Sequence, residues 1–200
     1  MKSQPLNLGF LASGNGSSAR AIVAAIRAGG LAAEARLLVS NNRSAPALAF
    51  AAEAGVPTLC IATKADPQAA DRKLAQAMAD HGVELIVLSG YLRQLGPETL
   101  ARYAGRVLNI HPGPLPAFGG HGMYGQRVHE AVIAAGAPES GICIHLVDEE
   151  YDRGPVIARR SVPVAPGDTA EALQARVTAL EPEFFVETLR RVAQGEIVLP

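Results

Sequence analysis

The chain has 200 residues, of which 48% are hydrophobic and 18% are charged, with a formal net charge of −1. This composition predicts one domain over residues 1–200 and gives no electrostatic reason to expect nucleic-acid binding. No apolar run approaches the roughly 18 residues of a membrane span, and residues 1–5 do not resemble a signal peptide. We therefore expect a cytoplasmic protein without a membrane or nucleic-acid partner, in which Cys60 and Cys143 are free thiols.

Strand-like and helix-like segments alternate through the first 110 residues. Short apolar runs predict strands at 6–12, 34–40, 57–61, 83–88 and 106–110. The segments between them predict helices at 18–27, 45–54, 67–80 and 97–103. The alternation predicts an α/β protein with a Rossmann-like, mostly parallel twisted sheet and helices on both faces.

The pattern changes after residue 111. Residues 112–126 are rich in glycine and proline, which predicts an irregular segment. Further strands are expected at 141–147 and 155–164, with a small final strand at Val198. Helices are expected at 128–135 and 169–191. The sheet should therefore end in mixed C-terminal strands.

A glycine-rich turn follows the first predicted strand. Residues 14–19 read GNGSSA, which matches the pattern G-x-G-x-x-A between a strand and a helix. Backbone N–H groups at such a helix start bind anions. A dinucleotide fold would also place a carboxylate at the end of the second strand, where this chain has Ser40, Asn41 and Asn42. The turn therefore favours a monophosphate, with an ordinary glycine-rich turn and a dinucleotide site as alternatives.

Residues 109–112, which read NIHP, place two polar side chains at the end of the fifth predicted strand. Side chains alternate along a strand, so Asn109 and His111 share one face, and Pro112 ends the strand. Ligands of open α/β sheets bind at the carboxyl ends of the strands. A carboxamide can donate to an oxyanion, and an imidazole can exchange a proton near neutral pH. The pair is a candidate catalytic site.

The remaining polar candidates are histidines and an acidic loop. The five histidines show no metal-binding spacing, so no metal is predicted. His145 lies in a strand-like segment and is either buried and hydrogen-bonded or directed into the site, whereas His129 suits a structural position. Asp152 lies in the acidic loop 148–155. If its carboxylate reaches His111, it should orient the imidazole and raise its pKa.

Four motifs together resemble the phosphoribosylglycinamide formyltransferase family. They are SGNGS at 13–17, GYLR at 90–93, NIHP at 109–112 and DEEYDRGP at 148–155. The resemblance covers about residues 6–192. It implies an enzyme that transfers a formyl group from 10-formyltetrahydrofolate to the amine of glycinamide ribonucleotide (GAR), the third step of de novo purine biosynthesis. Both substrates are small molecules.

The resemblance also implies roles for individual residues. Those that match the family's catalytic residues are Asn109, His111 and Asp152. Those that match the site for the phosphate and ribose of GAR are Asn15, Gly16, Ser17, Ser18 and Glu181. Those that match the folate pocket are Leu92, Arg93, Gln94, Leu95, Asn109, Val147 and Asp148. Residues 116–126 match a loop that closes over the site.

The chain departs from the family near residues 64–70, where Lys64 is the one basic candidate for the folate tail. Related formyltransferases that act on tRNA or hydrolyse formyltetrahydrofolate carry added domains, which favours the GAR enzyme. Two alternatives come from other classes, a non-catalytic nucleotide-binding module and a nicotinamide-dependent oxidoreductase. A monomer and a homodimer are both compatible with the sequence.

Overall fold

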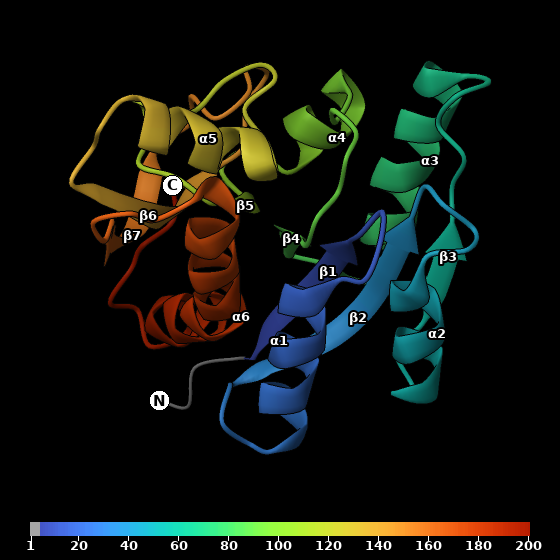
Figure 1. Cartoon of the computed structure of the whole chain (residues 1–200). Coiled ribbons are helices and arrows are strands. Elements are labelled where there is room, and N and C mark those ends of the chain that lie inside the picture. The colour runs from blue at the N-terminus through green and yellow to red at the C-terminus, as the bar shows by residue number, and fades with distance from the viewer. Residues whose placement is uncertain (1–4) are drawn as a thin grey trace.

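Strands form one seven-stranded sheet in the computed structural model, which describes residues 5–200 (Figure 1). They are β1 (Leu6–Leu11), β2 (Ala33–Ser40), β3 (Thr58–Cys60), β4 (Leu85–Leu88), β5 (Val107–His111), β6 (Glu139–Leu146) and β7 (Val156–Pro163). Their order is β3-β2-β1-β4-β5-β6-β7, from one side of Figure 1 to the other. The first five are parallel, and β6 and β7 are antiparallel to their neighbours.

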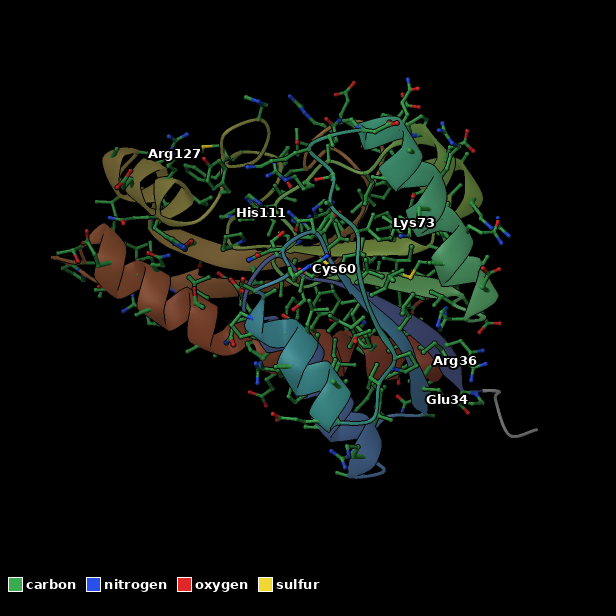
Figure 2. The ribbon with its side chains drawn as sticks, turned by 90° about the vertical axis from the view of Figure 1, so that its right-hand side faces the viewer. Glu34, Arg36, Cys60, Lys73, His111 and Arg127 are labelled. Atoms are coloured by element: carbon green, nitrogen blue, oxygen red, sulfur yellow. The ribbon has the colours of Figure 1, made fainter. Side chains whose placement is uncertain are left out.

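Helices cover both faces of the sheet. They are α1 (Ser17–Arg27), α2 (Pro46–Glu53), α3 (Pro67–Asp80), α4 (Pro97–Arg102), α5 (Gln126–Ala134) and α6 (Ala170–Ala193). Side chains of α1, α2, α5 and α6 join the hydrophobic core on one face, and those of α3 and α4 join the core on the other. Figure 2 shows α3 across the sheet from α1 and α2. Along β4, Leu85 and Val87 face the first core, whereas Ile86 and Leu88 face the second.

This architecture confirms the predicted Rossmann-like α/β fold with mixed C-terminal strands. Most element boundaries lie within one to three residues of the expected ones. Thr169 caps α6, because its Oγ1 accepts from the Ala172 N–H (3.2 Å). Within residues 5–200, no helix has the length and apolarity needed to cross a membrane.

The final strand expected at Val198 is wrong. The N–H groups of Glu196 and Ile197 donate back to the carbonyl of Arg191 at the end of α6 (2.9 and 3.2 Å). The backbone there is therefore used to end the helix, and Val198 is 84% exposed. The apolar run at 197–199 is only three residues long and shows no alternation, so it was too weak a strand signal.

Candidate active site

The strand β5 places the two residues of the NIHP motif where the sequence predicted. Leu108 and Ile110 pack into the core on one face, so Asn109 and His111 point to the opposite face. His111 is buried and Asn109 is half-buried. Figure 2 shows His111 enclosed among neighbouring side chains.

Asp152 joins this pair from the segment after β6, which folds back across β5. Its Oδ2 lies 3.4 Å from His111 Nδ1, and its Oδ1 lies 3.4 Å from His145 Nε2. The Asp152 backbone has φ 56°, a left-handed conformation that costs a residue with a side chain on the order of 1 kcal/mol or more. Gly154 completes the turn, because a Cβ there would lie 1.9 Å from the Leu146 carbonyl oxygen. The tight turn therefore holds the carboxylate between two imidazoles.

Burial and neighbouring charges shift the pKa values of His111 and Asp152 in opposite directions. Burial lowers the pKa of His111, and the nearby Asp152 and the carbonyl of Phe118 offset only part of that effect, so the pKa lies below its ordinary 6.5. Asp152 does act to raise the pKa of His111, as expected, but desolvation of the imidazolium is the larger effect, so the net shift is downward and not upward. Burial raises the pKa of Asp152, but contacts with His145, His111 and Gly120 outweigh it and lower the pKa below 3.8.

His145 belongs to the cluster, which the sequence left open. It lies opposite Asn109 in the antiparallel pairing of β5 with β6. Its Nδ1 donates to the Leu146 carbonyl (2.8 Å), and its Nε2 lies 3.2 Å from Asn109 Nδ2. The same Nε2 is 3.4 Å from Asp152 Oδ1, so the ring lies between the Asn109 amide and the Asp152 carboxylate. His145 therefore orients the candidate oxyanion donor.

A cavity opens beside these residues and contains most of the predicted folate contacts. Its lining includes six of them, Arg93, Gln94, Leu95, Asn109, Val147 and Asp148. His145 and Asp152 also line it. Leu92 does not, and its side chain is 71% exposed. Its backbone N–H donates to Ser13 Oγ (2.8 Å), so this residue ties the cavity wall to the turn after β1.

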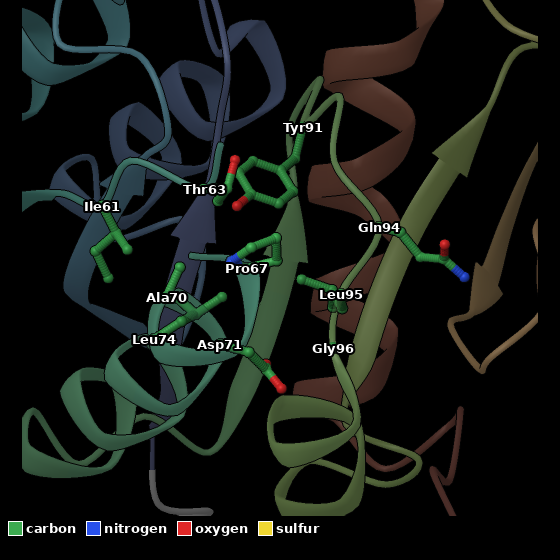
Figure 3. Close-up of a pocket in the computed structure, with 10 residues that line it drawn as sticks. All are labelled: Ile61, Thr63, Pro67, Ala70, Asp71, Leu74, Tyr91, Gln94, Leu95 and Gly96. Atoms are coloured by element: carbon green, nitrogen blue, oxygen red, sulfur yellow. The ribbon is translucent and has the colours of Figure 1, made fainter. Parts of the chain in front are cut away.

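A second cavity adjoins the first, between the start of α3 and the 91–96 segment (Figure 3). The two cavities share Tyr91, Gln94 and Leu95. Figure 3 shows the Gln94 amide directed away from Tyr91. Its Nε2 donates to the carbonyl of Glu149 (3.0 Å), so Gln94 joins the two walls of the first cavity.

The GNGSSA turn has the geometry of an anion site. Gly16 precedes α1 in a left-handed conformation (φ 65°), and as a glycine it has no side chain to cap the first N–H groups of the helix. Asn15 and Ser17 are exposed, whereas Ser18 is buried. The sequence did not single out Ser89, whose Oγ accepts from the Ala19 N–H (3.0 Å) and links the end of β4 to α1.

Glu181 lies near the middle of α6, a helix that packs against α1 and α5. Burial raises its pKa from 4.5 to about 7. A carboxyl group held partly out of water, on a helix that packs against the one carrying the phosphate turn, can accept hydrogen bonds from sugar hydroxyls. Among residues 5–200, no three His, Cys, Asp or Glu side chains are grouped as a metal would require.

The fold and this cluster define a class of protein. The chain belongs to the formyl transferase family, whose profile matches residues 6–189. This confirms the family that the four motifs predicted.

Known members of this family include several GAR enzymes similar to the chain. The chloroplastic phosphoribosylglycinamide formyltransferase of Vigna unguiculata is 38% identical over 96% of the chain, which spans 62% of that relative. The phosphoribosylglycinamide formyltransferase of Escherichia coli is 34% identical over 96% of the chain and 89% of that relative. The crystal structure of glycinamide ribonucleotide transformylase 1 from Symbiobacterium toebii superposes with a TM-score of 0.88, at 32% identity over 98% of this chain and 92% of that one. The chain thus spans less than two thirds of the plant relative and most of the bacterial ones.

Proposed function

We propose that the protein transfers a formyl group from 10-formyltetrahydrofolate to the amine of GAR, a step of purine biosynthesis. The observation that carries the proposal is the convergence of Asn109, His111 and Asp152 beside a cavity. The cavity would hold the folate, and the turn before α1 would hold the phosphate of GAR. Glu181 would accept hydrogen bonds from the ribose hydroxyls.

The proposed reaction needs no covalent intermediate on the enzyme. The amine nitrogen of GAR attacks the formyl carbon on N10 of the folate, and a tetrahedral oxyanion forms. The side-chain amide of Asn109 donates to the oxyanion, and one such donor contributes about 2.7–4 kcal/mol in other enzymes. The C–N10 bond then breaks, the nitrogen of the former amine loses a proton, and N10 receives one.

His111 and Asp152 assist this charge transfer in the proposed mechanism. His111 is neutral near pH 7 in the free protein, because burial lowers its pKa. An oxyanion beside the ring would raise that pKa, so the ring takes up a proton from solvent as the oxyanion forms and returns it to solvent when the oxyanion collapses. Asp152, which is ionised before the reaction, stabilises the resulting imidazolium, accepts the proton released by the amine and passes it on to N10.

The proposal is tested by titrating the protein separately with GAR, tetrahydrofolate and NADH in a calorimeter. We expect binding of GAR and of tetrahydrofolate, and none of NADH. Replacing Ser17 by Asp should abolish GAR binding by repulsion of its phosphate, while tetrahydrofolate still binds. Binding of NADH alone would contradict the proposal and favour an oxidoreductase, and binding of GAR alone would favour a non-catalytic nucleotide-binding module.

Three further features of the protein stay proposals. Two free cysteines, Cys60 and the buried Cys143, fit a reducing compartment, and we propose the cytoplasm. The oligomeric state is proposed to be a monomer or a homodimer. The organisation of residues 1–200 as one domain likewise rests on the sequence.

A further inference from the structure

The backbone of residues 118–120 contacts the catalytic pair directly. This segment belongs to the connection between β5 and α5 (Figure 1). His111 Nε2 donates to the carbonyl of Phe118 (2.7 Å). The N–H of Gly120 donates to Asp152 Oδ2 (3.0 Å). One short stretch of main chain thus presents an acceptor to the histidine and a donor to the aspartate.

That arrangement fits one protonation pattern of the pair. A carbonyl can only accept, so His111 must carry a proton on Nε2, which directs Nδ1 toward Asp152. An amide N–H can only donate at this distance, so Asp152 is best bound as the carboxylate. Both contacts are favourable at once only when Nδ1 is protonated too, so the segment is complementary to the imidazolium–carboxylate pair that forms during the proposed reaction.

Side-chain packing holds the segment in place on both sides. The ring of Phe118 packs against the hydrophobic core. Beyond Gly120, the His121 ring meets the Tyr151 ring edge-on, with centroids 5.9 Å apart. Gly119 allows the close approach, because a Cβ there would lie 3.0 Å from Asp152 Cβ and 2.3 Å from Leu115 Cδ2.

We propose that residues 118–120 form a backbone clamp that orients the His111–Asp152 pair, with Gly120 as a positioning residue for the reaction. The effect of the clamp on catalysis rests on the proposed function, whereas its contacts with His111 and Asp152 do not. Gly120 has φ +104°, where an L side chain is strained, and a Cβ there would meet nothing within 4 Å. Substitution at this position therefore moves the N–H group without creating a clash.

The test compares Gly120→Ala with Gly167→Ala in the full chain. Gly167 has φ +81° and no atom within 4 Å of an added Cβ, so alanine strains it similarly, and it lies in the turn between β7 and α6. We expect kcat of formyl transfer to fall at least tenfold in Gly120→Ala, with KM for GAR within about threefold of the original. In Gly167→Ala both constants should stay within about threefold. Equal losses of kcat in both variants, or no loss in Gly120→Ala, would overturn the clamp.

A second measurement keeps the test independent of both folding and activity. In the unmodified protein, the Gly120 amide should exchange with deuterium at least tenfold more slowly than the Gly122 amide. Asp152→Ala should remove that difference. Equal exchange of the two amides would refute the clamp, even if formyl transfer is confirmed. Absence of formyl transfer in the unmodified protein, with Gly120 protected, would instead refute the proposed function alone.

Discussion

At the scale of single residues, burial sets the charge of the site as strongly as neighbouring groups do. It lowers the pKa of His111 despite the adjacent carboxylate and raises the pKa of Glu181 to about 7. Both groups are therefore neutral over part of the range near pH 7. Ionisable groups with shifted pKa values are common at catalytic and binding sites.

Glu181 should lower the stability of the folded protein at neutral and alkaline pH, although it contributes to GAR binding. Its folded pKa lies above its ordinary 4.5, so its contribution to stability is fully present below pH 4.5 and is lost as the pH rises through about 7. Glu181→Gln removes the ionisation, so its free energy of unfolding should exceed that of the original protein by up to about 3 kcal/mol at pH 8 and differ little at pH 5. Urea unfolding at both pH values measures this.

Glu183 provides the matched control, because it is exposed on the same helix. Glu183→Gln should not change the dependence of stability on pH. The Glu181→Gln variant should also bind GAR at least tenfold more weakly. A pH dependence that is the same in both variants would contradict a half-buried carboxyl with a raised pKa at position 181.

At the scale of elements, the site is assembled where a parallel sheet becomes antiparallel. Pairing of β5 with β6 sets His145 opposite Asn109, and the turn after β6 returns Asp152 to the same place. A hydrogen bond from Gln94 to Glu149 then connects the turn to the segment after β4. Each wall of the cavity is thus carried by a different element.

Gln94→Leu should loosen the folate cavity without disturbing the reacting groups. It removes one hydrogen bond between neutral groups, worth about 1 kcal/mol, so we expect KM for 10-formyltetrahydrofolate to rise about fivefold. The value of kcat should change less than threefold. Steady-state kinetics with Gln76→Leu, an exposed position on α3, provides the comparison. An unchanged KM in Gln94→Leu would show that the contact does not hold the cavity wall.

At the scale of the whole molecule, the sequence predicted what local patterns encode. The alternating apolar segments predicted the order of the strands and helices, and the GNGSSA turn predicted where the first strand gives way to the first helix. The spacing of Asn109 and His111 predicted that their side chains lie on the same face of β5. The participation of His145 depends on the register between two strands, which no local pattern specifies. The contacts of Phe118 and Gly120 use backbone atoms, so side-chain identity carries little signal for them. The pKa of His111 depends on burial, which emerges only when the chain packs.

The central claim is that Asn109 and His111 carry out acceptor-dependent formyl transfer. The most direct measurement is the absorbance change of 10-formyltetrahydrofolate turnover, with and without GAR, in the original protein, Asn109→Ala and His111→Ala. We predict turnover that requires GAR and falls at least 100-fold in each variant, while the melting temperature stays within a few degrees. Near-normal turnover in both variants would contradict the assignment of these residues, and equal turnover without GAR would make the protein a hydrolase.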